Sequence, residues 1–422
     1  MIKSTRRQFL KLVGAAGAAS PLALSSCATT APSVPNVVVV GGGFGGATAA
    51  RYVKKFDPSI NVTLLEPNKT YVTCPFSNAY LGGLRSIGSI THNYSGLSKA
   101  GVNVVHAMAT GVDVVNKLVW TADGSFPFDR AIMSPGIDFK WDATPGYDEA
   151  ASKIVPHAWK AGAQTEMLRQ QLMAMEDGGL VIIAPPPNPF RCPPGPYERA
   201  SMIAYYLKTV KPKSKLLILD PKAKFSKMPL FQEGWAIHYK DYIEWVGGDD
   251  GKVVEVDAKT RTVKTDFQTH KADVLNFIPA QKAGKIAHVG GLTGDGDWCP
   301  VNLSTFESTI NEGIHVLGDA ATVSGMPKSG NAANSEAKAC AAAVVTLLKG
   351  GAPGTAMTSN TCYSLITPDH GISVTAVWES GADKYKKLSG GLSPKGRDAE
   401  FRKQESLYAR GWYDNITNDI WG

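Results

Sequence analysis

The sequence predicts an α/β protein with two doubly wound parallel-sheet domains and a smaller C-terminal unit. Three observations predict it. Four valines at 37–40 run directly into a glycine-rich turn and an alanine-rich helix start. A second apolar strand begins near residue 179, and the chain from 351 onward repeats neither pattern. Because buried β-branched strands alternating with helices are typical of parallel sheets, we expect two Rossmann-like domains of dinucleotide-binding type and a C-terminal interface domain.

The first turn carries glycines at the spacing of a dinucleotide-binding loop. Gly41, Gly43 and Gly46 form G-x-G-x-x-G between strand and helix. These glycines allow a tight turn, close approach of a pyrophosphate and close packing of helix on strand. A second strand, 61–65, ends in Glu66, at the spacing of a carboxylate that accepts hydrogen bonds from ribose hydroxyls. The alternative is a glycine-rich packing turn without a ligand.

Two later segments resemble further cofactor contacts of flavoproteins with two dinucleotide-type domains. The strand 130–133 leads through Ser-Pro to Gly136, and the apolar strand 314–317 leads into Gly318-Asp319. The resemblance implies that Asp319 accepts a hydrogen bond from the ribitol chain of a flavin. Together with the first glycine-rich turn, these motifs in this order predict FAD as the cofactor.

The second domain lacks the matching nucleotide loop. Its strand 179–184 is followed by Pro185-Pro186-Pro187-Asn188-Pro189 in place of glycines. Proline has no N–H to donate to a phosphate, and its ring blocks close approach. We therefore expect an NAD-like domain that binds no NAD(P)H, which makes a pyridine-nucleotide disulfide reductase the least favoured function.

The predicted domain boundaries follow from these elements. The FAD-binding domain is discontinuous and takes 34–150 and 290–350. The NAD-like domain without a nucleotide site takes 151–289, and the C-terminal interface domain takes 351–422.

Residues 1–27 have the pattern of a twin-arginine export signal. Arg6-Arg7 precedes an apolar run at 12–24 that is too short to span a bilayer. Leu24-Ser25-Ser26-Cys27 resembles a lipoprotein cleavage box, which would place a lipid on Cys27; ordinary signal cleavage nearby is the alternative. Both predict a periplasmic protein, attached to a membrane only through a lipid at Cys27.

Charge and residue spacing exclude other classes of function. The formal net charge of +7 includes four basic residues in the first 27, so the rest of the chain is only mildly basic. No basic run is interleaved with aromatic residues, so we expect no nucleic-acid partner. No C-x-x-C motif or metal-ligand histidine spacing is present, so we expect no metal.

The cysteines carry the remaining chemistry. Five follow the signal, at positions 74, 192, 299, 340 and 362, and an odd number in an oxidising compartment leaves one unpaired or otherwise committed. Cys74 lies in the loop after Glu66, where related disulfide reductases carry two cysteines. A lone cysteine there is suited to a covalent thioether with the flavin ring, and a buried structural thiol is the alternative.

The other cysteines differ in their surroundings. Cys192 lies between prolines in a stiff loop, just before a helix start that carries Glu198 and Arg199, where nearby charges adjust a thiol pKa. Cys362 lies in the C-terminal unit. Cys340 falls in an alanine-rich helix at 334–348 and is expected in the core, whereas Cys299 has no assigned role.

With these residues the chain resembles the flavoprotein subunits of the flavocytochrome c sulfide dehydrogenase family. The most specific matching segments are 71–74, 189–200, 326–330, 360–363 and 412–416. The resemblance implies FAD tethered through Cys74, a redox disulfide between Cys192 and Cys362, and Glu198 and Trp412 near that disulfide. It also implies a heterodimer with a c-type cytochrome subunit, which alone carries haem.

The implied activity is oxidation of sulfide to sulfur or polysulfide through the disulfide and FAD. Lys328 is then expected near the flavin, where its charge stabilises the reduced ring. A sulfide:quinone reductase is the nearest alternative, and the polar character of 385–411 disfavours its membrane-facing helices. An alternative of another class is a non-catalytic flavin-binding electron carrier or scaffold whose disulfide is only structural.

Overall fold

The computed structural model describes residues 34–422. The expected export signal at 1–27 and the lipid-bearing Cys27 lie outside the described residues and stay predictions. The predicted α/β class is confirmed, with two parallel sheets and a C-terminal antiparallel sheet. Within 34–422, none of the helices combines the length and apolar character needed to cross a membrane.

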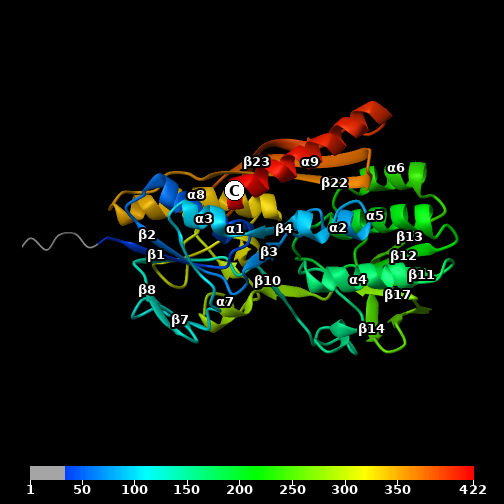
Figure 1. The fold of residues 1–422 in the computed structure, drawn as a ribbon, viewed down its shortest axis with the longest axis horizontal. Coiled ribbons are helices and arrows are strands. Elements are labelled where there is room, and N and C mark those ends of the chain that lie inside the picture. Colours follow the sequence, from blue (N-terminus) through cyan, green and yellow to red (C-terminus); the bar gives the residue numbers. More distant parts are fainter. Residues whose placement is uncertain (1–33) are drawn as a thin grey trace, which may run out of the picture. The chain divides into compact units, whose positions relative to one another are not determined.

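The first sheet contains the predicted valine strand at its centre. Its order is β20 (Ile314–Val316), β9 (Arg130–Met133), β1 (Asn36–Val40), β2 (Asn61–Leu65) and β5 (Asn103–Val105), all parallel. The valines are buried because β1 has neighbours on both edges and helices against it. Helix α1 (Phe44–Phe56) packs along α8 (Gly330–Leu348), as Figure 1 shows. Residues far apart in the chain therefore share one layer.

The glycine-rich turn is tight for the reason that the motif predicts. Gly41 has φ +99°, and a Cβ there would lie 2.3 Å from the carbonyl oxygen of Ser134. A Cβ at Gly46 would lie 1.9 Å from the carbonyl oxygen of Gly41. Any side chain at either position would displace α1 from the end of β1.

The second sheet holds the proline-rich turn. Its parallel strands are β13 (Ile243–Gly247), β12 (Lys215–Asp220), β11 (Leu180–Ala184) and β17 (Val274–Phe277). Its helices are α4 (Ala163–Ala174), α5 (Gly195–Val210) and α6 (Met228–His238). The prolines form a loop after β11, and α5 begins only at Gly195, so no helix N-terminus directly follows the strand.

The C-terminal unit is a three-stranded antiparallel sheet and a long helix. The strands are β22 (Met357–Thr367), β23 (His370–Glu379) and β24 (Lys386–Leu392), followed by α9 (Ala399–Trp421). In Figure 1 β22 and β23 run above both parallel sheets, and β22 contacts α8, α5 and α6. This unit therefore packs on elements of both sheets.

The remaining elements are short. The helices are α2 (Ser77–Leu81), α3 (Ser95–Lys99) and α7 (Lys285–Val289), with a 3-10 turn η5 (Gly318–Ala320) after β20. The strands are β3 (Thr70–Val72), β4 (Thr91–Asn93), β6 (Gly111–Asp113), β7 (Leu118–Thr121), β8 (Gly124–Pro127), β10 (Ile137–Phe139), β14 (Val253–Asp257), β15 (Thr262–Thr265), β16 (Thr269–Lys271), β18 (Gln281–Ala283), β19 (Cys299–Pro300) and β21 (Ala321–Thr322).

Candidate active site

Two cavities meet at Cys74. The first, the dinucleotide cavity, is lined by the first glycine-rich turn, Glu66, Gly136 and Cys74. The second, the cysteine cavity, is lined by Cys74, Cys192, Cys362, Glu198, Trp412 and other residues. Cys74 and Arg191 line both cavities.

Glu66 is held firmly at the end of β2. Its Oε2 accepts a hydrogen bond from the amide N of Gly42 at 2.8 Å, and its Oε1 accepts from the amide N of Asn68 at 2.9 Å. Gly136, with φ +65°, lies across the same cavity. The dinucleotide cavity thus has a fixed carboxylate and closely approaching glycine backbone, which suits the ribose and phosphates of a dinucleotide.

Asp319 has a buried carboxylate oxygen that can accept a hydrogen bond from a bound cofactor. It lies in η5 with its side chain largely buried, and Oδ1 has no hydrogen-bond partner among the described residues. Oδ2 lies 3.9 Å from Nη1 of Arg191. Burial raises the pKa of the carboxyl, against the nearby charges of Arg191 and Lys328. A buried carboxylate oxygen without a partner costs free energy, and a donor such as a ribitol hydroxyl would satisfy it. The residues therefore fit the flavin contact that the motif predicts.

Cys74 is presented by the loop that follows β3. Its Sγ accepts a hydrogen bond from Nη2 of Arg191 at 2.9 Å and lies 3.4 Å from the carbonyl oxygen of Trp159. Two residues later, Phe76 has φ +64° and caps α2. This sharp turn ends the loop and leaves the thiol at the junction of the two cavities.

Cys192 and Cys362 come together from separate parts of the chain. The structure describes both as free thiols, and they lie within hydrogen-bonding reach of each other. Cys192 has φ +86°, a left-handed conformation that costs a non-glycine residue roughly 1–2 kcal/mol. Its amide N donates to the carbonyl oxygen of Lys328 at 2.8 Å, and its own carbonyl accepts from the amide N of Gly195 at 2.7 Å. These bonds hold the strained loop against Cys362 on β22.

The two thiols differ in electrostatic environment. The hydrogen bond with Cys192 holds the pKa of Cys362 below its ordinary value, and the charge of Lys227 adds to this against burial and Glu198. The same hydrogen bond, with burial and the charges of Cys362 and Glu198, raises the pKa of Cys192. In the reduced pair Cys362 is therefore the thiolate end.

Glu198 lies in the first turn of α5, beside the pair. Its Oε1 accepts from the amide N of Leu365 at 2.9 Å, and its Oε2 accepts from Nδ2 of Asn78 at 2.9 Å. Burial raises the pKa of this carboxyl, although both hydrogen bonds and the charges of Lys227 and Arg199 oppose the rise. A carboxyl whose pKa is raised in this way is suited to proton transfer beside the cysteine pair.

The other two predicted residues lie in different surroundings. Trp412 on α9 lines the cysteine cavity, with its ring centroid 6.4 Å from that of Tyr363. The ammonium of Lys328 donates to the carbonyl oxygens of Asp319 at 2.8 Å and Ala321 at 2.7 Å. It lies 4.0 Å from the ring centroid of Trp298, and Lys328 lines a third cavity of about 990 Å³. The structure thus brings the three cysteines, Glu198 and Trp412 together, whereas the Lys328 ammonium supports the Asp319 turn.

Sequence reasoning missed two cations near the cysteines, Arg191 and Lys227. Arg191 stands within the motif of Cys192, which was noticed for its thiol and for the charges of Glu198 and Arg199. Arg199 is buried and donates to the carbonyl oxygens of His157 at 3.1 Å and Ala158 at 2.6 Å. Lys227 lies in no motif, so only the fold reveals it. Among residues 34–422, no group of three His, Cys, Asp or Glu side chains is placed to hold a metal ion.

Comparison with known proteins matches these features. The family model "Flavocytochrome c sulphide dehydrogenase, flavin-binding" matches residues 354–421, and "Sulfide dehydrogenase (flavocytochrome c) flavoprotein chain, central" matches 165–279. The flavoprotein chain of that enzyme from Chlorobaculum thiosulfatiphilum is 72% identical over 43 residues, which are 10% of this chain and 90% of that sequence. The chain belongs to the flavocytochrome c sulfide dehydrogenase flavoprotein family. The predicted family resemblance is therefore confirmed.

More distant relatives share the fold of this family. The model "Pyridine nucleotide-disulphide oxidoreductase" matches residues 35–181. The mitochondrial sulfide:quinone oxidoreductase of Dictyostelium discoideum is 21% identical over 71% of this chain and 68% of its own length. The sulfide:quinone oxidoreductase of Aquifex aeolicus has a TM-score of 0.68 at 16% identity over 92% of both chains. The NAD-dependent persulfide reductase of A. fulgidus has a TM-score of 0.62 at 15% identity, over 89% of this chain and 77% of its own. The flavin-binding family models support FAD as the cofactor.

Proposed function

We propose that this chain oxidises sulfide to polysulfide with Cys192 and Cys362 as a redox-active disulfide, and passes the electrons through FAD to a c-type cytochrome subunit. One observation carries the proposal. The two thiols are in contact, and their cavity shares Cys74 and Arg191 with the dinucleotide cavity. Family membership supports the substrate, because a relative of this family is named a sulfide dehydrogenase.

The first step is nucleophilic cleavage of the oxidised pair. Hydrosulfide attacks Sγ of Cys192, the Cys192–Cys362 bond breaks, and the electron pair leaves on Sγ of Cys362. Cys192 then carries a persulfide. Cys362 is the better leaving group because its pKa is held lower than that of Cys192.

The second step releases the product. A second hydrosulfide attacks the outer sulfur of the persulfide, so that hydrogen disulfide leaves and Cys192 becomes a thiolate. Glu198, whose pKa is raised by burial, takes up the proton that the product loses. When bound, FAD would supply the two-electron acceptor for re-formation of the disulfide, and Glu66, Cys74 and Asp319 would hold it.

We further propose a thioether between Cys74 and FAD, because the Cys74 thiol lies where the two cavities meet. The cytochrome partner, in a heterodimer, is proposed from the name of the family, flavocytochrome c. Periplasmic export through residues 1–27 remains a proposal from the sequence.

The test replaces Cys362 by serine in the FAD-loaded protein. We expect Cys362→Ser to abolish sulfide-dependent bleaching of the visible flavin spectrum while FAD stays with the protein, because hydrosulfide then meets no disulfide. Cys340→Ala is the matched control, since Cys340 is a buried thiol of the alanine-rich α8 and lines neither cavity. Bleaching by sulfide at the wild-type rate in Cys362→Ser would contradict the disulfide scheme, and no bleaching in the wild type would favour the non-catalytic flavin-binding carrier or scaffold.

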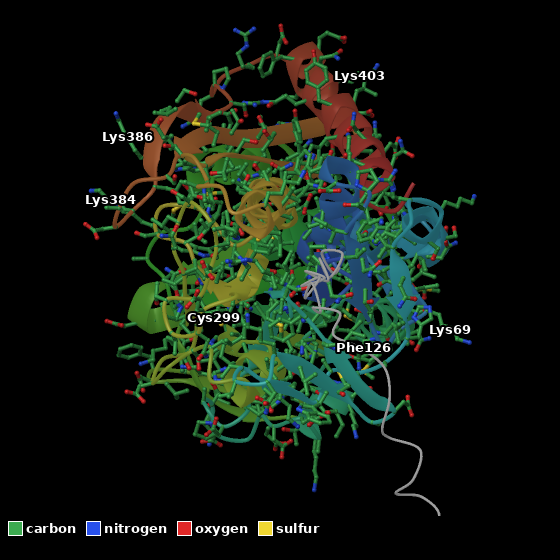
Figure 2. The ribbon with its side chains drawn as sticks, turned by 90° about the vertical axis from the view of Figure 1, so that its left-hand side faces the viewer. Lys69, Phe126, Cys299, Lys384, Lys386 and Lys403 are labelled. Carbon is green, nitrogen blue, oxygen red and sulfur yellow. The ribbon has the colours of Figure 1, made fainter. Side chains whose placement is uncertain are left out.

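A sulfide:quinone reductase is the second candidate, favoured by the similarity to the Dictyostelium enzyme. The surface of the C-terminal unit argues against a quinone in a membrane. Lys384 and Lys386 extend outward at the edge of its sheet and Lys403 from α9, as Figure 2 shows. Turnover with cytochrome c and none with a short-chain quinone supports our proposal, and the reverse result supports the second candidate.

A further inference from the structure

Lys227 reaches the cysteine pair from the second parallel sheet. It precedes α6 with φ +60°, a left-handed conformation that a lysine rarely adopts. Its side chain is nearly inaccessible, since the residue is 3% exposed. The ammonium donates to the carbonyl oxygen of Cys362 at 2.9 Å and to Oγ of Ser364 at 2.7 Å. A strained backbone and a buried charge are both costly, and here both serve to place one cation against β22.

The charges around the pair are unequal. Cys362 on β22 faces Lys227, Glu198 and Cys192. On the other side, Cys192 faces Glu198, Cys74 and Cys362. Arg191 and Arg199 also lie near it, since the charge of Cys192 raises the pKa of both arginines. The two arginines are already engaged elsewhere. Arg191 donates to Cys74, and Arg199 donates to backbone carbonyls and to Oδ1 of Asn276 at 2.8 Å. Lys227 is hydrogen-bonded to the residue that bears the thiol itself.

We propose that Lys227 is a positioning residue that makes Cys362 the thiolate end of the cysteine pair. The inference rests on the proposed function, in which this polarity decides where sulfide attacks. When hydrosulfide bonds to Cys192 and the disulfide breaks, the electron pair collects on Cys362, beside the ammonium. Attack at Cys362 would instead leave the charge on Cys192, which Lys227 does not stabilise; Glu198 faces both sulfurs and favours neither.

The hydrogen bonds of Lys227 also fix the geometry. By donating to both Cys362 and Ser364, the ammonium pins the stretch of β22 that carries the thiol. The pKa of Cys362 agrees with this arrangement. The hydrogen bond with Cys192 lowers it most, and the charge of Lys227 lowers it further, although burial opposes both effects.

The test measures thiol reactivity in the reduced, full-length protein without sulfide. Iodoacetamide alkylation of Cys362 is followed across pH by peptide mass spectrometry, because only the thiolate reacts. We expect Lys227→Met to shift the alkylation midpoint to higher pH and to slow alkylation of Cys362 near neutral pH by about tenfold, which corresponds to about one pKa unit. Lys227→Arg retains the charge and is expected to keep the wild-type profile.

A second buried lysine gives the matched control. Lys211 lies in the same part of the chain and donates to the carbonyl oxygens of Met173 and Met175, away from every cysteine. Lys211→Met is expected to leave the Cys362 profile unchanged. If Lys227→Met does not fold, Lys227→Gln takes its place, since it removes the charge and keeps a donor.

Two outcomes overturn the inference. An unchanged Cys362 profile in the uncharged variants would show that the ammonium does not set the polarity. An equal shift in Lys227→Arg would show that the lysine acts only through packing. The alkylation profile of Cys362 is measured without sulfide, so it does not depend on the proposed function. If sulfide fails to bleach the wild-type flavin, the proposed function is refuted, but the alkylation result still tests the role of Lys227.

Discussion

Among residues 34–422, Cys74 alone places a nucleophilic atom where the dinucleotide cavity and the cysteine cavity meet. Arg191 donates a hydrogen bond to its sulfur at 2.9 Å, which fixes the position of that sulfur at the proposed attachment point. The same arginine lies 3.9 Å from Asp319, whose other oxygen lacks a partner among the described residues. One cation thus links the proposed attachment point to the proposed ribitol contact.

We predict that Cys74→Ala releases the flavin. In the wild-type protein the yellow chromophore is expected to stay with the acid-precipitated polypeptide, whereas in Cys74→Ala it is expected to appear in the supernatant, because no thioether forms. Cys192→Ser is the control, since it removes a thiol of the same cavity and keeps Cys74. A chromophore that precipitates with Cys74→Ala would rule out this attachment point.

Residues whose role is local could be predicted from the sequence. Gly41 and Gly46 could be recognised from the spacing of the motif. Glycine is required at both positions because the turn leaves no room for a Cβ. Lys227 could not be predicted, because it meets Cys362 only after two distant segments pack together. Lys328 is expected near the flavin from the resemblance, and its ammonium donates to two backbone carbonyls of the turn that carries Asp319, a contact that no sequence motif indicates.

At the scale of elements, helix α8 is fastened to the turn that carries Asp319. Ser329 caps α8 by accepting from the amide N of Ala332 at 3.2 Å, so the helix begins at Gly330 and not at the expected residue 334. One turn further along, Oε2 of Glu336 accepts from the amide N of Gly318 at 2.8 Å. Burial raises the pKa of Glu336 to about 7, against that hydrogen bond and the charge of Lys328.

We predict that Glu336→Gln flattens the pH dependence of stability. The carboxyl keeps its proton up to about pH 7 in the folded protein, whereas in the unfolded chain it loses the proton near its ordinary pKa of 4.5. The contribution of Glu336 to the free energy of unfolding is therefore fully present below the unfolded-state pKa. It decreases by roughly 3 kcal/mol as the pH rises to the folded-state pKa. Urea midpoints at about pH 5 and about pH 8 should differ less in Glu336→Gln than in the wild type. Glu400→Gln, an exposed change on α9, is the control, and equal slopes in all three proteins would refute the assignment.

Buried strands were easier to predict from the sequence than exposed ones. The strands β1, β2 and β11 were predicted because parallel strands covered on both faces leave continuous apolar runs. In contrast, β24 is exposed along its whole length, so no apolar pattern marks it and the sequence indicated only a third unit. A helix start was predicted at Glu198, and α5 begins slightly earlier, at Gly195, because its first turn accepts a proline.

At the scale of the molecule, α9 carries the chain terminus back to the first sheet. In Figure 1 it runs from the far end of the C-terminal sheet to the region of α1 and α3, both of which it contacts. Trp421, 4% exposed, stacks on His92 at 5.0 Å and on Tyr71 at 5.2 Å between ring centroids. It also meets Phe44 edge-on at 5.3 Å, directly after the glycine-rich turn. The terminus therefore packs against the segments that lead to Cys74 and to the dinucleotide cavity.

We predict that Trp421→Ala destabilises the protein by about 3–5 kcal/mol, the usual cost of removing a buried tryptophan. The change should also loosen the loop of Cys74, because Tyr71 on β3 loses its stacking partner. Thermal unfolding and flavin fluorescence report the two effects. Trp120→Ala serves as the control, since Trp120 is 43% exposed. Equal melting temperatures for the two variants would show that the terminus does not support the first sheet.

The sulfur atoms at 74, 192 and 362 belong to three widely separated stretches of polypeptide. A nascent chain therefore carries its thiols apart until β22, which bears Cys362, has been made and has packed beside the loop of Cys192. Under the proposed function, a chain that stops before β22 holds no cysteine pair, so sulfide meets no disulfide.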